Sequence, residues 1–514
     1  MRWLRMLSTV VLVIGLVWIA GRLIFPVPST EGRPVEAAMP FDPTTTLGPQ
    51  AEQALSAHAG QSGVIPLPDG QNALHSRMRL AEGAERSIDA MYYIWHDDVS
   101  GLLLLDALRD AAARGVRVRL LLDDNGVAGM DGMLAALNAM PNFSVRIFNP
   151  STVRSPKAAG YLLYPLRMNR RMHNKAFIVD GAVAIVGGRN IGDEYFAMGD
   201  VPAYLDLDVL GVGEVVTDTA TIFDQYWNSQ PVLALEQVID GEGDIAAFDA
   251  AVTAAETSEE GQAFATAAQS VADRLVAGEA PPMEWTDVQV VADDPIKGMG
   301  THDRDQLMIT RLSGILGGVS TNLDLLSAYF VPGKEGTRYF SDLARAGVNV
   351  RILTNSWEAT DVPMVHAGYI KYRRELLEAG VTLFELKPIA GLSQGKSELG
   401  PFGSSGASLH AKTFTADDSR VFIGSFNFDP RSAALNCEMG FLIDSAAIAH
   451  SGSAALTDGL AARSFQPVLE GDKMVWRDPQ PDGSTVMIEH EPGLGFGNRI
   501  AVYVLNLLPI EWLL

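Results

Sequence analysis

Two stretches of the sequence repeat one pattern of polar residues: MHNKAFIVDGAVAIVGGRN at residues 172–190 and LHAKTFTADDSRVFIGSFN at residues 409–427. In each stretch a histidine is followed, at fixed intervals, by a lysine, an aspartate, a glycine and an asparagine. These are His173, Lys175, Asp180, Gly187 and Asn190 in the first copy and His410, Lys412, Asp417, Gly424 and Asn427 in the second. The offset is 237 residues at every position (410 − 173 for the histidines), and five matches in two co-linear copies exclude coincidence.

The repeat extends to the segments before each copy. Apolar, strand-like runs at residues 87–95 and 116–122 flank a helical pattern at residues 101–113, and residues 322–330, 339–346 and 348–353 repeat that order. A strand, a crossover helix and a second strand are typical of a parallel or mixed sheet covered by helices. We therefore expect an α/β fold with two homologous lobes, each a mixed β-sheet flanked by helices.

The same signals divide the 514-residue chain into six parts. They are an N-terminal anchor or signal segment (1–26), a linker (27–59), the first lobe (60–230), a helical connector (231–285), the second lobe (286–450) and a C-terminal extension (451–514). Within the extension we expect a hairpin around Asp482-Gly483 and an apolar tail that includes Trp512. The tail either docks onto a bilayer, with Trp512 at head-group level, or packs on the second lobe.

Composition limits the classes of partner. The 47% hydrophobic and 20% charged residues are typical of a folded protein, and 39 Lys and Arg against 62 Asp and Glu give a net charge of −23. Such a surface repels nucleic acid, so we expect no nucleic-acid partner. Any site that binds a phosphate must be a local basic exception, that is, a cluster of basic residues on an otherwise acidic surface. The single cysteine, Cys437, excludes an intrachain disulfide and a Cys-based metal site. No other metal-ligand spacing occurs, and we expect neither a metal nor a cofactor.

The N-terminus carries a membrane-targeting pattern. Arg2 and Arg5 precede an uncharged run at residues 6–21, which is slightly shorter than a spanning helix needs. Trp18 and Ala20 suit a cleavage site poorly, so we favour an uncleaved anchor over a signal peptide. The two arginines would stay in the cytoplasm and the bulk of the chain would lie outside that membrane; cleavage would make the protein secreted.

The repeated residues suit the transfer of a phosphoryl group without a metal. Each lysine lies on the same strand face as its histidine and offers a positive charge, and each asparagine offers amide donors. Two such sets face to face can stabilise a transferring phosphoryl group, with one histidine as nucleophile and the other as general acid and base.

Each histidine needs a carboxylate on its other ring nitrogen. Asp208 and Glu438 are the candidates, because each lies on the apolar strand that follows its own motif. Asp180 and Asp417 lie at the turn after the motif strand, and we expect them to orient that turn or a lysine rather than to carry protons.

Two loops near the motifs could serve the substrate. The first contains the local basic exception and has no acidic residue between Asn149 and Met172; its cations are Arg154, Lys157, Arg167, Arg170 and Arg171. It either captures an anionic head group or is a solvated loop beside an acidic neighbour. The second loop, residues 390–407, contains five glycines and four serines, and it is either a lid over the site or a flexible connection without a role in function.

The two copies resemble the motif of the phospholipase D superfamily. YYIWHDD at 92–98, GVRVRLLLDDN at 115–125, NRRMHNKAFIVDGAVAIVGGRNIGDEYF at 169–196, GSFNFDPRS at 424–432 and LLPIEWLL at 507–514 resemble the C class of bacterial cardiolipin synthases. The resemblance implies two phospholipase D-type lobes with one active site at their interface, and a bacterial inner-membrane enzyme whose bulk is periplasmic. It also implies phosphatidyl transfer to phosphatidylglycerol through a phosphohistidine, with phosphatidylglycerol or phosphatidylethanolamine as donor.

In the superfamily the N-terminal motif often supplies the nucleophile. We therefore expect His173 to be the nucleophile and His410 the general acid and base, and the reverse assignment stays open. Gly188 in the first copy occupies the position of Ser425 in the second. Whether the Ser425 hydroxyl contacts the phosphate, on one side of the site only, stays open.

Three other functions compete with the transferase. A hydrolytic phospholipase D would use the same residues with water as acceptor. A nuclease is disfavoured by the acidic charge and the apolar ends of the chain. An inactive membrane scaffold is disfavoured because both motif copies are intact, and the sequence predicts no particular partner protein.

Overall fold

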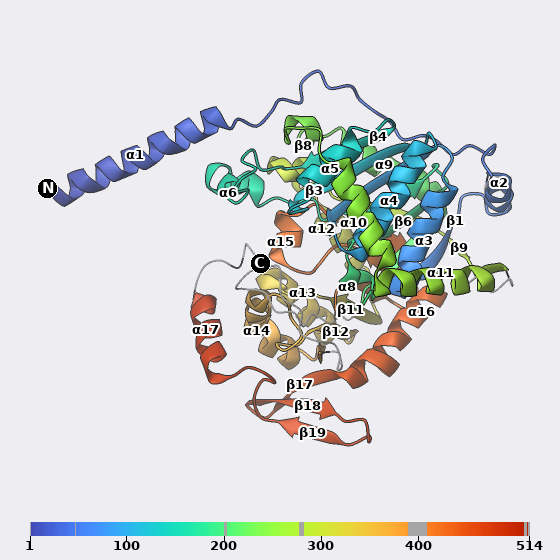
Figure 1. Ribbon diagram of the computed structural model, residues 1–514. Helices are drawn as coiled ribbons and strands as arrows, with labels where there is room; N and C mark the ends of the chain where they lie inside the picture. Colours follow the sequence, from blue (N-terminus) through green and yellow to red (C-terminus); the bar gives the residue numbers. More distant parts are fainter. Residues whose placement is uncertain are drawn as a thin grey trace.

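The computed structural model describes residues 2–46, 48–199, 203–276, 282–388, 409–507 and 511. Two mixed sheets lie side by side, and helices cover their outer faces (Figure 1). The predicted α/β fold with two homologous lobes is confirmed. The expected glycine-rich lid (390–407) and Trp512 lie outside the described residues.

The first lobe contains a nine-stranded sheet in the order β8-β4-β3-β2-β5-β6-β7-β1-β9. Strands β2, β3 and β4 are parallel and the other pairings are antiparallel. The strands are β1 (Ser62–Leu67), β2 (Ser87–Ile94), β3 (Arg117–Gly126), β4 (Phe143–Phe148), β5 (Ala176–Val179), β6 (Val183–Gly187), β7 (Asp208–Gly213), β8 (Val232–Ala234) and β9 (Glu284–Thr286).

The second lobe contains a ten-stranded sheet in the order β10-β16-β15-β14-β11-β12-β13-β17-β18-β19. Six of these strands, β13-β12-β11-β14-β15-β16, repeat the order β4-β3-β2-β5-β6-β7 of the first lobe. The strands are β10 (Val288–Ala292), β11 (Asn322–Ser327), β12 (Asn349–Asn355), β13 (Thr382–Leu386), β14 (Lys412–Ala416), β15 (Arg420–Gly424), β16 (Met439–Ile443), β17 (Ser464–Glu470), β18 (Lys473–Pro479) and β19 (Thr485–Ile488). The antiparallel pair β18–β19 confirms the predicted hairpin.

Crossover helices connect the parallel strands, as the sequence pattern predicts. Asp98 shows why α4 begins where it does, because its carboxylate accepts the Gly101 amide at 3.0 Å and caps the helix. The longer helices are α1 (Arg2–Ile24), α2 (Gly48–Ala57), α3 (Gly70–Gly83), α4 (Val99–Ala113), α5 (Asp131–Asn138), α9 (Glu214–Trp227), α10 (Ile245–Thr257), α11 (Glu259–Val276), α12 (Met308–Leu316), α13 (Gly333–Arg345), α14 (Pro363–Glu378), α16 (Ala446–Ala454) and α17 (Phe496–Leu507).

The segment expected as a helical connector belongs largely to the first lobe. Strand β8 pairs with β4, and α10 and α11 pack on the helices of that lobe. The chain crosses to the second sheet at Asp287, between β9, which pairs with β1, and β10, which pairs with β16.

The two lobes share one apolar core. Strands β6 and β7 of the first lobe meet β15 and β16 of the second, with α9 beside them. Val186, Val209, Ile423 and Phe441 are all fully buried in this cluster. Because burial of such side chains is worth about 2 kcal/mol each, separating the lobes would expose a costly surface. The relative position of the two motif copies is therefore fixed.

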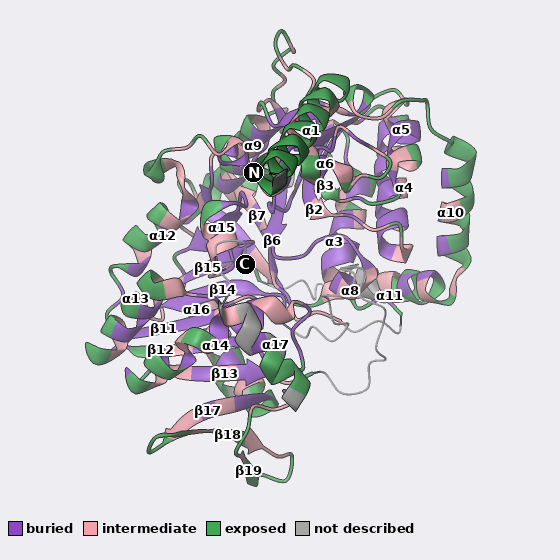
Figure 2. Ribbon diagram, turned by 90° about the vertical axis from the view of Figure 1, so that its left-hand side faces the viewer, coloured by how far each residue is buried: buried purple, intermediate pink, exposed green. Residues whose placement is uncertain are grey.

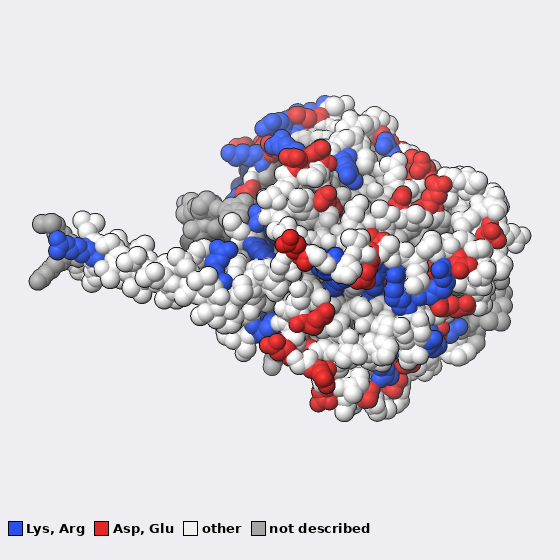
Figure 3. All heavy atoms as spheres, turned by 90° about the horizontal axis from the view of Figure 1, so that it is seen from above, with Lys and Arg blue, Asp and Glu red and all other residues white. Residues whose placement is uncertain are grey.

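The N-terminal helix α1 projects from the body and is exposed along its length (Figure 2). Residues Trp3–Ile24 have a mean hydropathy of 2.2 with none of the segment buried, so by length and composition this helix can cross a membrane. Figure 3 shows it as a rod with few charges, beside a body where charges of both signs mix. Residues Phe496–Leu507 of the apolar tail form α17, which packs on α14 through Val502 and Ala367.

The motif aspartates lie at the turns after β5 and β14, and their carboxylates bind the backbone before β2 and β11 rather than their own turn or a lysine. Asp180 accepts the amides of Glu85, Arg86 and Ser87 at 2.8–2.9 Å and so holds the start of β2. Asp417 binds the amides of Ser320 and Thr321 before β11 in the same way. These amides lower the pKa of Asp417 to about 2, although burial acts to raise it.

We predict that Asp180→Ala lowers the free energy of unfolding by about 2–3 kcal/mol, because three backbone amides, one buried and two partly buried, lose their acceptor. Asp180→Asn should cost less, since asparagine keeps one acceptor and tolerates the left-handed backbone (φ 51°) at this position. Denaturant unfolding measures both values. Equal stability of the alanine variant and the unchanged protein would contradict this structural role.

Candidate active site

The two motif histidines lie just before β5 and β14, where the lobes meet. The His173 amide donates to the Cys437 carbonyl, and the His410 amide donates to the Leu205 carbonyl, both at 2.8 Å. Short parallel bridges, Met172 with Cys437 and Leu205 with Leu409, accompany these bonds. Each motif is thus joined by backbone hydrogen bonds to the opposite lobe.

Each histidine is held by a carboxylate of the opposite lobe. His173 Nδ1 lies 2.8 Å from Glu438 Oε2, and His410 Nδ1 lies 2.6 Å from Asp206 Oδ2. Both carboxylates are fully buried. A carboxylate on Nδ1 fixes the ring and leaves Nε2 for chemistry.

The expected contacts between each histidine and the carboxylate of its own lobe are wrong. Glu438 binds His173 rather than His410, and Asp208 forms a buried ion pair with Arg77 at 2.8 Å. Strand register explains the second error: Asp208 lies opposite Gly187, whereas Gly440 lies opposite Gly424. Asp206, two residues before Asp208, is therefore the counterpart of Glu438.

Glu438 and Asp206 have different surroundings. Ser425 and Ser432 donate to the Glu438 carboxylate at 2.5 and 2.9 Å, so the Ser425 hydroxyl serves Glu438 rather than standing free for a phosphate. In the first copy Gly188 replaces this serine. A Cβ there would lie 2.1 Å from Asp206 Oδ1, which leaves no room for a side chain.

The electrostatics keep both imidazoles neutral at pH 7. Burial lowers the pKa of His173 to about 4, although Glu438 acts to raise it. Burial and the Lys412 charge hold the pKa of His410 well below its usual value. Burial acts to raise the pKa of Glu438, but His173 and Lys175 lower it overall, so Glu438 is ionised and accepts the His173 Nδ1 proton.

The lysines and asparagines of both motifs are also buried at this interface. Lys175 Nζ donates to the His173 carbonyl at 2.6 Å, and Lys412 Nζ lies 2.9 Å from His410 Nδ1. Asn190 donates to the Tyr195 hydroxyl at 2.9 Å. Within the described residues Asn427 Oδ1 has no hydrogen-bond partner. Burial lowers the pKa of Lys412 to about 8, so its charge is sensitive to a bound anion.

Aromatic rings that the sequence analysis missed flank the histidines. Tyr93 meets His173 edge-on with ring centroids 5.0 Å apart, and Tyr195 and Tyr204 both lie 5.2 Å from His410. Tyr93 and Tyr195 occur in the stretches quoted for the family resemblance. Tyr204 has no sequence signal of its own.

The basic loop is largely neutralised by acidic neighbours. Lys157 and Arg154 both pair with Asp124, and Arg171 pairs with Asp123. Arg167 and Arg170 donate to the backbone carbonyls of Pro150 and Leu166. Their expected binding of a head group therefore stays a prediction.

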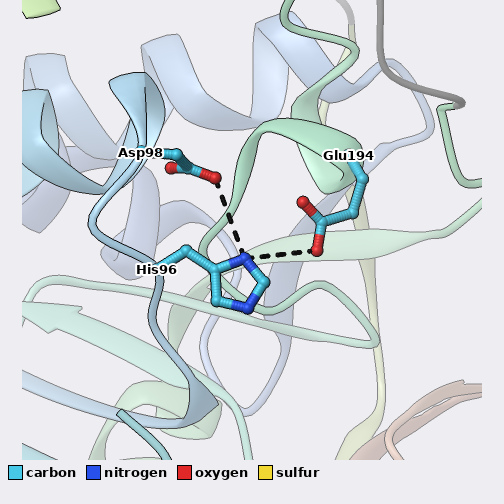
Figure 4. Close-up of side chains that lie close together, drawn as sticks. All are labelled: His96, Asp98 and Glu194. Carbon is cyan, nitrogen blue, oxygen red and sulfur yellow. Dashed lines mark ion pairs between the residues drawn. The ribbon is translucent and has the colours of Figure 1, made fainter. Parts of the chain in front are cut away.

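The His410 side of the site is acidic. His96 lies between Asp98 and Glu194, 3.8 and 3.4 Å from their oxygens (Figure 4). These three ligand atoms are close enough to hold a cation, and the expectation of no metal stays a prediction.

Asp361 adds to this acidic side. It is 8% exposed; Tyr329 donates to its Oδ2 at 2.6 Å, and its Oδ1 has no hydrogen-bond partner of good geometry in the described part of the chain. Burial and the nearby carboxylates, Asp361 and Glu194, raise the pKa of Tyr204.

Comparison with known proteins identifies the family. The profile of "Cardiolipin synthase, PLD-like domain" matches residues 78–227 and 315–456, one match in each lobe. The chain belongs to the phospholipase D-like cardiolipin synthase family. Its family fold agrees with a crystal structure of phosphatidylserine synthase from Haemophilus influenzae, with a TM-score of 0.57 and 12% identity, covering 90% of this chain and 100% of that one.

Relatives within the family align over most of the chain. Cardiolipin synthase C of Escherichia coli is 44% identical over 463 residues, 89% of this chain and 98% of the relative. An uncharacterised protein of Helicobacter pylori is 32% identical over 91% of this chain and 93% of its own. A cardiolipin synthase of Staphylococcus aureus is 26% identical over 77% of this chain and 67% of its own.

The crossed pairs predict which carboxylates matter for turnover. Asp206→Asn and Glu438→Gln should each lower kcat about 10³-fold, because an amide no longer fixes the proton on Nδ1. Asp208→Asn is the control, since it leaves Arg77 unpaired and should cost about 3–5 kcal/mol of stability while turnover per folded molecule changes little. Lipid-product assays with denaturant unfolding separate the effects. A turnover defect in Asp208→Asn that matches Asp206→Asn would contradict the assignment.

Proposed function

We propose that the protein is a cardiolipin synthase that transfers a phosphatidyl group to phosphatidylglycerol through a phosphohistidine. The observation that carries the proposal is the pair of histidines at one interface, each with Nδ1 held by a carboxylate of the opposite lobe. This arrangement leaves two Nε2 atoms and two lysines for one phosphodiester. The membership of the family and the Escherichia coli relative support it.

In the first step His173 Nε2 attacks phosphorus, and the bond from phosphorus to the head-group oxygen breaks. His410 gives a proton to that oxygen. The lysine charges lower the pKa of His410 in the free protein. A bound anionic phosphodiester partly cancels those charges, raises the pKa of His410 and so favours the protonated imidazole that the first step requires. In the second step His410 removes a proton from a hydroxyl of phosphatidylglycerol, whose oxygen displaces His173 and completes cardiolipin.

The surroundings of the two histidines support His173 as the nucleophile. Glu438 is ionised and bound by two serines, which gives His173 one fixed tautomer with a free Nε2. Burial raises the pKa of Asp206 and lowers the pKa of Lys412 to about 8, so the charged forms of both groups beside His410 are less favoured than in water. Such a pair suits proton exchange.

The acidic side supports phosphatidylethanolamine as a donor. The leaving head group lies next to His410 in this mechanism, and Asp361 and Glu194 both influence the Tyr204 hydroxyl beside that ring. Negative charge there favours a primary ammonium over a neutral glycerol. The expected phosphatidylglycerol donor would react at the same histidines and release glycerol.

We place the protein in the bacterial inner membrane, anchored by α1. Arg2 and Arg5 at the beginning of this helix support a cytoplasmic N-terminus and a periplasmic body.

The test uses purified, detergent-solubilised protein with labelled phosphatidylglycerol, with and without phosphatidylethanolamine. We expect cardiolipin, with ethanolamine released when phosphatidylethanolamine is present. Mass analysis of a rapidly quenched reaction should find a phosphatidyl group on the peptide that contains His173. Phosphatidic acid as the sole product would identify a hydrolase instead, and an adduct on the His410 peptide would reverse the two roles.

A further inference from the structure

Helix α1 is bound at its C-terminal end to a short helical segment of the first lobe. This α6–α7 segment (Ala159–Met168) comprises α6 (Ala159–Leu163) and α7 (Pro165–Met168). Trp18 Nε1 donates to the Leu162 carbonyl at 3.1 Å, and the Tyr164 hydroxyl donates to the Phe25 carbonyl at 2.9 Å. The contact is close at Gly21, where an added Cβ would lie 2.7 Å from a methyl group of Leu163.

The charges on α1 locate the membrane surface relative to this segment. Arg5 and Arg22 bound the apolar run and are 17 residues apart (22 − 5), about 25 Å along a helix, close to the thickness of a hydrocarbon core. The Arg22 guanidinium lies 4.6 Å from the rings of both Trp18 and Tyr164. Trp18 is one turn closer to the bilayer centre than Arg22, and Leu162 contacts Trp18. With α1 across the bilayer, as proposed above, the segment would be level with the lipid head groups.

The segment presents leucines to its surroundings. Leu162 is 76% exposed and Leu166 is 66% exposed, and Leu162 belongs to α6, which contacts α1. Figures 1 and 2 place α1, α6 and α17 on the same face of the molecule, and Ile500 of α17 is 52% exposed. Isolated exposed leucines are common, but these continue the apolar surface of α1.

The segment also reaches the catalytic histidine of the first lobe. The Tyr161 hydroxyl donates to Asn125 Oδ1 at 3.0 Å, and Asn125 Nδ2 donates to the Tyr93 hydroxyl at 3.3 Å. The Tyr93 ring contacts the His173 ring. The side chains of Tyr161, Asn125 and Tyr93 thus link the segment that carries Leu162 to His173.

We infer that the α6–α7 segment is a second membrane-contact element, which inserts Leu162 and Leu166 into the outer leaflet beside α1. It keeps the face that carries the His173 side of the active site against the lipid surface. If α1 were the single membrane contact, the folded body could rotate about the chain segment that follows Ile24. With both contacts its orientation is fixed.

The experiment places a fluorescent label at single cysteines in the full-length protein, reconstituted in phosphatidylglycerol–phosphatidylcholine vesicles that contain quencher-labelled lipids. The chain suits this test because Cys437 is its single cysteine and is buried. Labels at Leu162→Cys and Leu166→Cys should show blue-shifted emission and strong quenching by the lipids. Val11→Cys in α1 is the positive control for insertion.

Two exposed apolar positions outside this face are the matched negative controls. Ile245→Cys on α10 and Val486→Cys on β19 replace residues that are 44% and 48% exposed. Labels there should emit as in water, with less than a tenth of the quenching. Quenching at positions 162 and 166 no greater than at 245 and 486 would overturn the inference. So would an unquenched label at position 11, because the inference requires an inserted α1.

Discussion

The active site depends on two hydrogen bonds that cross between lobes, from His173 to Glu438 and from His410 to Asp206. Neither lobe contains a complete pair, so the fold must hold the lobes in one relative position. The shared core around Val186, Ile423 and Phe441 supplies that rigidity, and the backbone bonds from His173 and His410 to the opposite lobe set the alignment. A duplicated sequence motif thus becomes one site with two different halves.

The halves differ in ways that support different roles. Glu438 has two serine donors, whereas the smaller Asp206 lies against Gly188 and shares His410 with Lys412. Glu194 and Asp361 lie near the tyrosine beside His410, whereas on the His173 side Arg171 is paired with Asp123. A symmetric repeat alone would treat donor and acceptor lipids alike, whereas two different halves allow the proposed enzyme to distinguish them.

Much of this could be predicted from the sequence, because an exact offset of 237 residues and the strand signals define two homologous lobes. The motif residues and the structural role of Asp180 follow from their positions on strands and turns. The crossed pairing could not be predicted, since it depends on how the lobes pack and on the register that places Asp208 opposite Gly187. The same register places Asp206, rather than Asp208, in contact with His410. Sequence spacing alone cannot distinguish these two aspartates.

The most direct test of a single shared site is the turnover number of His173→Ala and of His410→Ala in the full-length enzyme. Both variants should lose at least about 10³-fold in kcat per folded molecule, because each removes one half of the same reaction centre. Retention of activity within about tenfold by either variant would show that each lobe works alone, and it would contradict the account.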